Sequence, residues 1–152
     1  MSVTVRPASA NDINQIRQLY DEYMETDIQR DSTLRQAIAS NDSEILVAEA
    51  QGKLVGLIHQ LFYVDPLHSG TCSSLLFLYV TEAFRRQRIG STLLDKALES
   101  AAKRSVREVH VSTRSDNFAA MRLYDKLRFE YAGPLFECTH GESVDLLTGS
   151  TL

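Results

Sequence analysis

The sequence has few cysteines, no long apolar segment and no excess of positive charge. Its two cysteines, Cys72 and Cys138, are too few and too far apart to indicate a disulfide framework or a zinc site, so reduced thiols are expected. No apolar run is long enough to span a bilayer, and the first residues lack the basic-then-apolar pattern of a signal peptide. We therefore expect a cytoplasmic protein.

The net charge of −4 excludes the broad positive surface that most binders of nucleic acids or anionic membranes carry, so neither partner is expected. The four histidines are scattered without ligand spacing, and we expect no metal: His59, His68, His110 and His140. A length of 152 residues fits a single domain, residues 1–152.

The positive charge that is present gathers in one turn. Residues 74–80 are apolar and bounded by turn formers, which predicts a buried strand. Three arginines follow within four residues: Arg85, Arg86 and Arg88. A helix is predicted next, because one face of it is apolar: Ile89, Leu93, Leu94, Ala97, Leu98 and Ala101. At the start of a helix the backbone N–H groups lack intrahelical hydrogen-bond acceptors. A basic turn directly before such a helix therefore indicates a phosphate-binding site.

A second amphipathic helix is predicted after a strand at residues 108–113. Ser115 or Asp116 suits its N-cap, and apolar residues recur at helical spacing through Leu127. Asn117 and Tyr124 lie seven residues apart, about two helical turns, and so share a face that can run beside an extended ligand.

Together the two blocks resemble the GCN5-related N-acetyltransferase (GNAT) family. Its pyrophosphate loop follows the pattern Gln/Arg-x-x-Gly-x-Gly/Ala, which Arg85 opens and Gly90 closes here. Its later pattern Asn-x-x-Ala-x-x-x-Tyr-x-x-x-Gly-Phe is matched at four positions: Asn117, Ala120, Tyr124 and Phe129. Arg88 and Arg128 stand where the patterns have glycine.

The resemblance implies an α/β (α+β) fold, with a mixed, mostly antiparallel sheet of about seven strands and about four helices on both faces. Periodicity places the strands at residues 2–8, 44–49, 54–62, 74–80, 108–113, 129–136 and 142–147, with a hairpin turn at residues 51–53. Helices are expected from Asn11 or Asp12, over residues 32–39, and after each of the two motif strands.

The resemblance also implies acetyl-CoA as co-substrate. In the family, the cofactor strand and its neighbour separate and receive the pantetheine arm. The residues expected to bind the cofactor here are Leu78, Tyr79, Val80, Arg85, Arg86, Gln87, Arg88, Ile89, Gly90, Ser91, Asn117, Ala120 and Tyr124.

Acyl transfer from a thioester to an amine releases a thiolate, and Tyr124 is the predicted proton donor because a phenol with an ordinary pKa of about 10 stays protonated. An acceptor amine with a pKa of about 10.4 must lose a proton before it attacks. The strand before the loop offers no carboxylate. Water and five residues remain candidate bases: Glu82, Tyr79, Tyr63, His68 and Asp65.

The family binds its acceptor on the first helices and the last strand pair. By this resemblance we expect acceptor contacts at Glu22, Tyr23, Glu25 and Tyr79, and transfer of the acetyl group to a primary amine of a small molecule. Acetylation of a protein or peptide amine is an alternative. A non-catalytic acyl-CoA sensor is another, because Arg88 and Arg128 replace two glycines of the family patterns, and a required positive φ would disfavour arginine. A homodimer is also open.

Overall fold

The computed structural model describes residues 2–25 and 28–133. The chain divides into two compact units, Met1–Ser112 and Thr113–Leu152. The first unit contains five strands: β1 (Val3–Pro7), β2 (Ser43–Ala50), β3 (Lys53–Asp65), β4 (Gly70–Val80) and β5 (Val109–Val111). Its α-helices are α1 (Ile13–Met24), α2 (Asp31–Ala39) and α3 (Ile89–Lys103), and its short 3₁₀ helices are η1 (Ala10–Asp12) and η2 (Glu82–Phe84).

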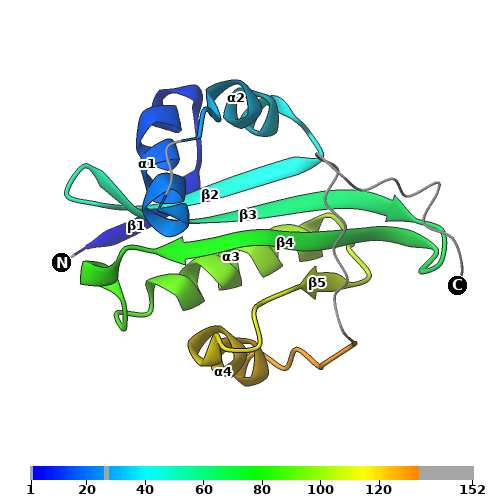
Figure 1. Ribbon diagram of the computed structural model, residues 1–152. Coiled ribbons are helices and arrows are strands. Elements are labelled where there is room, and N and C mark those ends of the chain that lie inside the picture. The colour runs from blue at the N-terminus through cyan, green and yellow to red at the C-terminus, as the bar shows by residue number, and fades with distance from the viewer. Residues whose placement is uncertain (1, 26–27, 134–152) are drawn as a thin grey trace, which may run out of the picture. The chain divides into compact units, whose positions relative to one another are not determined.

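The five strands form one sheet in the order of the chain, as Figure 1 shows. The pairs from β1 to β4 are antiparallel, and β5 pairs parallel to β4. The predicted hairpin between β2 and β3 is confirmed: Ala50 pairs with Lys53, and the two residues between them, Gln51 and Gly52, have φ of 52° and 75°. Two positive φ values in a two-residue loop suit the twist of the strands.

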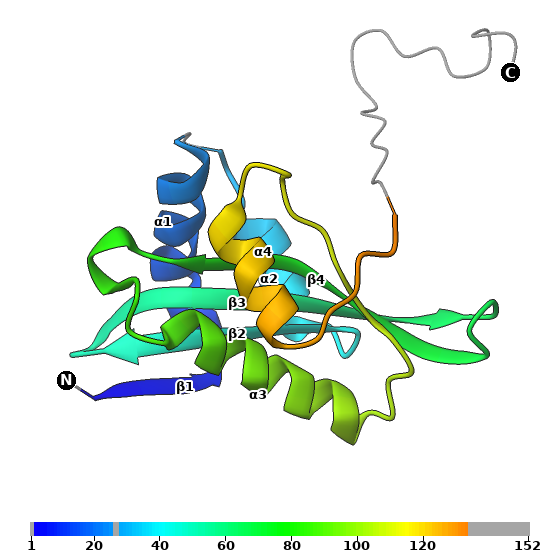
Figure 2. The same cartoon turned by 90° about the horizontal axis from the view of Figure 1, so that it is seen from below.

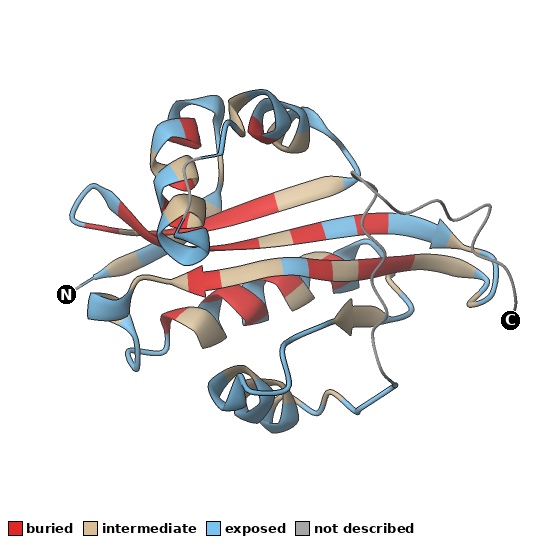
Figure 3. Ribbon diagram, viewed as in Figure 1, coloured by how far each residue is buried: buried red, intermediate tan, exposed pale blue. Residues whose placement is uncertain are grey.

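Helices cover both faces of this sheet, as predicted. Helices α1 and α2 lie on one face and α3 on the other (Figure 1), where α3 contacts the first four strands (Figure 2). Helices α1 and α3 each bury an apolar stripe at helical spacing, α2 buries Leu34, and the central strands are buried between the layers (Figure 3). The buried residues of α3 are Ile89, Leu93, Leu94, Ala97 and Ala101.

Gly56 allows β3, β4 and α3 to approach closely. A Cβ atom at this position would lie 2.8 Å from the carbonyl oxygen of Tyr79 and 3.3 Å from a methyl group of Leu93. Because the nearest of these atoms is backbone, a larger residue would push β4 away. The glycine therefore positions the end of β4 against the start of α3.

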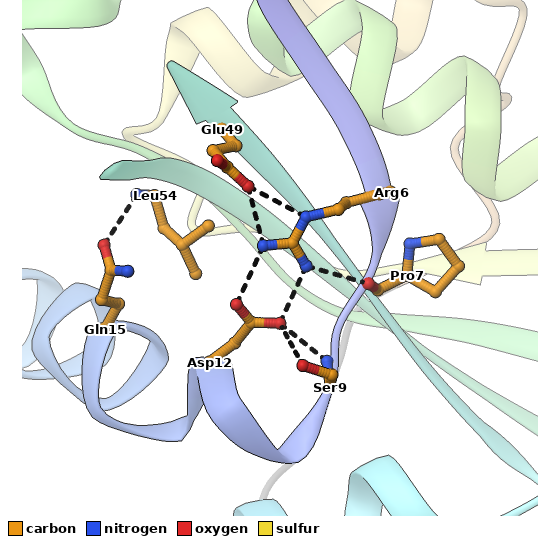
Figure 4. A network of polar contacts seen from close by, with 7 residues as sticks. All are labelled: Arg6, Pro7, Ser9, Asp12, Gln15, Glu49 and Leu54. Carbon is orange, nitrogen blue, oxygen red and sulfur yellow. Dashed lines mark hydrogen bonds and ion pairs between the residues drawn. The ribbon is translucent and has the colours of Figure 1, made fainter. Parts of the chain in front are cut away.

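A polar network fastens β1 to its neighbours (Figure 4). The Arg6 guanidinium donates to both carboxylate oxygens of Asp12, each at 2.9 Å, and to Glu49 at 2.8 and 2.9 Å. Asp12 is buried and also accepts from the backbone N–H of Ser9 at 2.7 Å. These bonds join β1, η1 and β2, and sequence periodicity gave no sign of them.

The second unit contributes helix α4 (Phe118–Lys126). Its predicted N-cap was wrong: Asn117, and neither Ser115 nor Asp116, accepts the N–H of Ala120 at 3.1 Å. Asp116 instead pairs with Arg114 at 3.1 Å. The physical reason is that the capping oxygen must precede the helix directly, and the helix begins three residues later than Ser115.

The fold class is confirmed, with a different number of strands. The described residues contain five strands, whereas about seven were predicted. Residues 129–133 of the predicted sixth strand have no regular secondary structure, and Glu130 to Gly133 are exposed. No described strand pairs with this segment, and a strand forms only where its backbone has a partner to pair with. Residues 134–136 and the predicted strand at 142–147 lie outside the described residues.

Candidate functional site

The predicted phosphate loop joins β4 to α3. Residues 85–88 are exposed, Ile89 is buried, and Gly90 and Ser91 form the first turn of α3. Among the described residues, no side chain caps this helix start, so its first N–H groups lack an intrahelical acceptor. Among the described residues, no carboxylate pairs with Arg85, Arg86 or Arg88. Unpaired positive charge next to open N–H groups can hold a phosphate.

Two arginines of the loop have left-handed backbone. The φ angle is 58° at Arg86 and 64° at Arg88, the residue directly before α3. Arg88 therefore has the conformation for which glycine is usually required, in the position where the family pattern has glycine. The loop takes this conformation despite the substitution.

The Arg85 side chain contacts the end of β4. Its Nε donates to the carbonyl oxygen of Val80 at 3.0 Å, and its guanidinium lies over the Tyr79 ring, 5.6 Å from the centroid. These contacts leave the other guanidinium N–H groups for an anion. Arg85 thus links the strand to the loop.

The carboxyl half of β4 has one open edge. Strand β5 pairs with β4 only at Ser73, Ser74 and Leu75, whereas β3 pairs with β4 as far as Val80. Residues 76–80 therefore have no strand partner on the β5 side among the described residues. The register also shifts between Leu75 and Phe77, which is a β-bulge at Leu76. Leu78, Tyr79 and Val80 lie on this open segment, where the resemblance predicted main-chain contacts to pantetheine.

Four aromatic rings gather where α1 faces the open half of β4. We call Tyr20, Tyr23, Phe77 and Tyr79 the aromatic cluster. Tyr20 stacks on Phe77 with 4.3 Å between centroids, and the Tyr23 ring meets Phe77 and Tyr79 edge-on at 5.0 and 5.7 Å. Sequence reasoning missed Tyr20 and Phe77 as site residues, although i, i+3 spacing of Tyr20 and Tyr23 and alternation of Phe77 and Tyr79 were visible signals.

A carboxylate adjoins the aromatic cluster. The Tyr79 hydroxyl donates to Glu22 Oε1 at 2.8 Å. Burial, followed by this hydrogen bond, raises the pKa of Tyr79, and burial raises the pKa of Tyr20 to about 12, so both phenols stay protonated near neutral pH. Of the predicted acceptor residues, the structure therefore brings Glu22, Tyr23 and Tyr79 together. Glu25 is exposed just after α1.

The candidate bases fall into two groups. Tyr63, Asp65 and His68 belong to the hairpin between β3 and β4, at the amino end of β4. Eight residues separate Cys72, opposite Tyr63, from Val80, which corresponds to about 26 Å along a strand. Tyr79 is next to the phosphate loop, and Glu82 lies in η2 and is exposed.

In the second unit, Asn117 and Tyr124 both lie at helix α4. The Asn117 side-chain oxygen caps the helix, which leaves its NH₂ group as a donor. Tyr124 is half-buried, its ring is 5.6 Å from that of Phe129, and burial raises its pKa. Arg128, next to Phe129, has a φ of 64°, and its backbone N–H donates to the backbone carbonyl oxygen of Asp125 at 2.9 Å where the helix ends.

The mixed sheet with an open strand edge, followed by a basic loop and an uncapped helix, is the arrangement of an acetyltransferase-type fold. Comparison of the sequence with protein families agrees, since the Acetyltransferase (GNAT) family matches residues 12–129. The chain belongs to this family.

Named relatives include N-acetyltransferase family 8 member 3 of Rattus norvegicus, 33% identical over 102 residues, which are 67% of this chain and 45% of the relative. The chain thus spans less than half the length of that relative. No helix within the described residues is both long and apolar enough to cross a membrane.

Solved structures show the same fold. An aminoglycoside acetyltransferase from an uncultured soil metagenomic sample superposes with a TM-score of 0.80 at 22% identity, covering 93% of this chain and 100% of that one. An aminoglycoside N-acetyltransferase in complex with CoA superposes with a TM-score of 0.80 at 16% identity, covering 92% and 96%.

Proposed function

We propose that this chain transfers the acetyl group of acetyl-CoA to a primary amine of a small molecule. The observation that carries the proposal is the open edge of β4 over residues 76–80, which leads directly into the basic loop and the uncapped start of α3. An extended amide-containing arm can pair with such an edge, and the phosphates at its end can bind the loop.

The transfer is a direct attack. The amine nitrogen forms a bond to the thioester carbonyl carbon, the carbon–sulfur bond breaks, and the sulfur leaves with the electron pair. Tyr124 gives its phenolic proton to this thiolate, and its raised pKa keeps that proton available at neutral pH. The NH₂ group of Asn117 is a donor for a pantetheine carbonyl. Both roles follow the family pattern that these residues match.

The aromatic cluster with Glu22 is the proposed acceptor site. The exposed Tyr23 ring can contact a cationic amine, and the Glu22 carboxylate lies beside it. The Tyr20 and Tyr79 rings already have the guanidinium groups of Arg30 and Arg85 over them, at 5.5 and 5.6 Å from the centroids. Asp21, by contrast, is paired with Arg30 at 2.8 Å and contributes little free charge. We further propose that Glu22 takes the proton that the ammonium must lose, directly or through water.

The test measures thiol release from acetyl-CoA by the purified chain with a panel of small amines, amino acids and peptides. Turnover with small cationic amines, reduced at least tenfold in Glu22→Gln, supports the proposal. Asp95→Asn, which neutralises an exposed carboxylate of α3, is the matched control and should keep the rate. Turnover with peptides alone would instead favour a protein acceptor. CoA binding without any turnover would favour a sensor, and no CoA binding would refute the assignment. A cytoplasmic location, a homodimer and a single domain over residues 1–152 stay predictions.

A further inference from the structure

A second group of reactive side chains lies at the opposite end of β4 from the phosphate loop. It comprises Asp65, His68 and Cys72 with the neighbouring Glu108, His110 and Tyr63, which we call the hairpin cluster. All of them belong to the first unit, in or beside the β3–β4 hairpin and at the start of β5. The proposed acetyl transfer uses none of them.

Three members of the hairpin cluster converge on one point. One ligand atom each from Asp65, His68 and Cys72 lies within 4.8 Å of the other two. Asp65 Oδ2 and His68 Nδ1 are joined by a hydrogen bond of 2.5 Å, which an ion bound by both atoms would replace. Cys72 is fully buried with a free thiol, and within the described residues that thiol has no hydrogen bond. A carboxylate, an imidazole and a thiol that meet in this way are the donor types that zinc prefers.

The outer groups of the cluster orient His68 as a ligand. Its other ring nitrogen, Nε2, is 3.0 Å from Glu108 Oε2, and the same oxygen is 3.1 Å from His110 Nε2. His110 Nδ1 is in turn 2.7 Å from the Tyr63 hydroxyl. Histidines that bind metals usually donate the second ring N–H to a carboxylate, which sets the tautomer and turns the first nitrogen toward the ion. Glu108 takes that position here, and this arrangement is independent of the convergence of the three donor atoms.

The backbone supports the arrangement. Asp65 Oδ1 accepts the N–H of Leu67 at 2.9 Å, which holds the carboxylate in the turn. Ser69, with a φ of 53°, closes the turn so that the chain returns along β3 and brings Cys72 opposite Tyr63. The backbone N–H of Ser73 donates to the carbonyl oxygen of Glu108 at 2.9 Å, which fixes Glu108 beside β4.

We propose that Asp65, His68 and Cys72 bind one zinc ion, with water as the fourth ligand and Glu108 as the partner of His68. Binding displaces the thiol proton of Cys72 and any proton shared between Asp65 and His68, so the affinity rises with pH. The ion would join the hairpin turn to β4 and stabilise the amino end of that strand. The sequence alone predicted no metal, because an Asp-x-x-His-x-x-x-Cys spacing becomes a site only when a hairpin folds it.

The test uses the full chain, without a histidine tag and stripped with a chelator, titrated with Co²⁺ and then Zn²⁺. We expect tetrahedral Co²⁺ absorption with a thiolate-to-cobalt charge-transfer band that saturates at one ion per chain and disappears on adding Zn²⁺. Cys72→Ser should abolish that band. Cys138→Ser, which changes the cysteine outside the described residues, should retain it.

Further variants keep the test decisive if Cys72→Ser fails to fold. Asp65→Asn changes a partly exposed turn residue, and we expect zinc affinity to fall more than a hundredfold with an unchanged circular dichroism spectrum. Glu108→Gln should weaken binding by about 10–100-fold. Absence of a saturable band, or zinc affinities unchanged in Asp65→Asn, would overturn the proposal and leave the cluster as a hydrogen-bonded network centred on His68.

Discussion

At the scale of single residues, Arg88 and Arg128 show what the family's glycines do. Both arginines have a φ of 64°, one directly before α3 and the other just after α4. For a residue with a Cβ atom this conformation costs about 1–2 kcal/mol. The substitutions therefore retain the backbone path of the family pattern at some cost in stability, and Arg88 adds a charge to the loop.

Replacing each arginine by glycine and by alanine separates conformation from charge. Arg88→Gly and Arg88→Ala remove the same side-chain charge, but only glycine relieves the left-handed strain. We expect the glycine variant to be more stable than the alanine variant by about 1 kcal/mol, and the same difference at Arg128. Urea denaturation measures it. Equal stabilities in both pairs would show that the positive φ values carry no strain.

The Tyr124→Phe substitution removes only the phenolic hydroxyl, and so tests whether this group donates a proton. The ring remains to pack beside Phe129, so the fold and the affinity for CoA should be unchanged. Loss of the phenolic proton should lower kcat by about 10²-fold, within the range for general acids. Steady-state kinetics with acetyl-CoA, together with CoA binding by calorimetry, checks both parts. An unchanged kcat would remove Tyr124 from the mechanism.

At the scale of elements, the phosphate loop depends on how β4 and α3 meet. Gly56 allows the end of β4 to approach the start of α3 closely. The Arg85 side chain donates a hydrogen bond to the carbonyl oxygen of Val80, so the first residue of the loop is fixed to the end of β4. Arg86 and Arg88 are exposed between these points. The arrangement predicts that the side chains of these arginines act on the cofactor by charge and make few contacts that stabilise the fold.

Arg86→Ala should weaken CoA binding by about fivefold to tenfold at low ionic strength, and the difference from wild type should shrink as salt is added, because exposed charges are screened. Arg35→Ala, which removes an exposed arginine from α2, is the matched control and should leave CoA affinity unchanged. Titration calorimetry at two salt concentrations makes the comparison. A loss that persists in full at high salt would contradict a purely electrostatic role.

At the scale of the whole molecule, the network of Arg6, Asp12 and Glu49 connects elements that are distant in the sequence. The hydrogen bonds from Arg6 are the main cause that lowers the pKa of Asp12 to about 2, against the opposing effect of burial. Because the unfolded chain binds this proton more readily, the stabilisation is complete above about pH 4 and disappears as the pH falls toward 2.

We therefore expect the free energy of unfolding to drop by about 1–2 kcal/mol through this group between pH 4 and pH 2, a range that allows for the partial exposure of Arg6. Urea denaturation across that range, compared with Asp12→Asn, isolates the contribution. The variant should be less stable near neutral pH and should lose less stability on acidification. Parallel pH curves for the two proteins would show that Asp12 has no special role.

Local sequence determined most of the elements and one end of the site. The apolar stripe of α3, the two-residue hairpin loop, the basic turn at residues 85–88 and the helix carrying Tyr124 all follow from patterns within a few neighbouring residues. Tertiary structure alone decided that β5 pairs with only three residues of β4. It also decided that Tyr79 forms a hydrogen bond with Glu22, 57 residues away, and that side-chain atoms of Asp65, His68 and Cys72 lie close together. The reason is physical: hydrophobic period and turn chemistry act over one or two turns of chain, whereas pairing and side-chain contacts between distant segments depend on how the whole sheet is assembled.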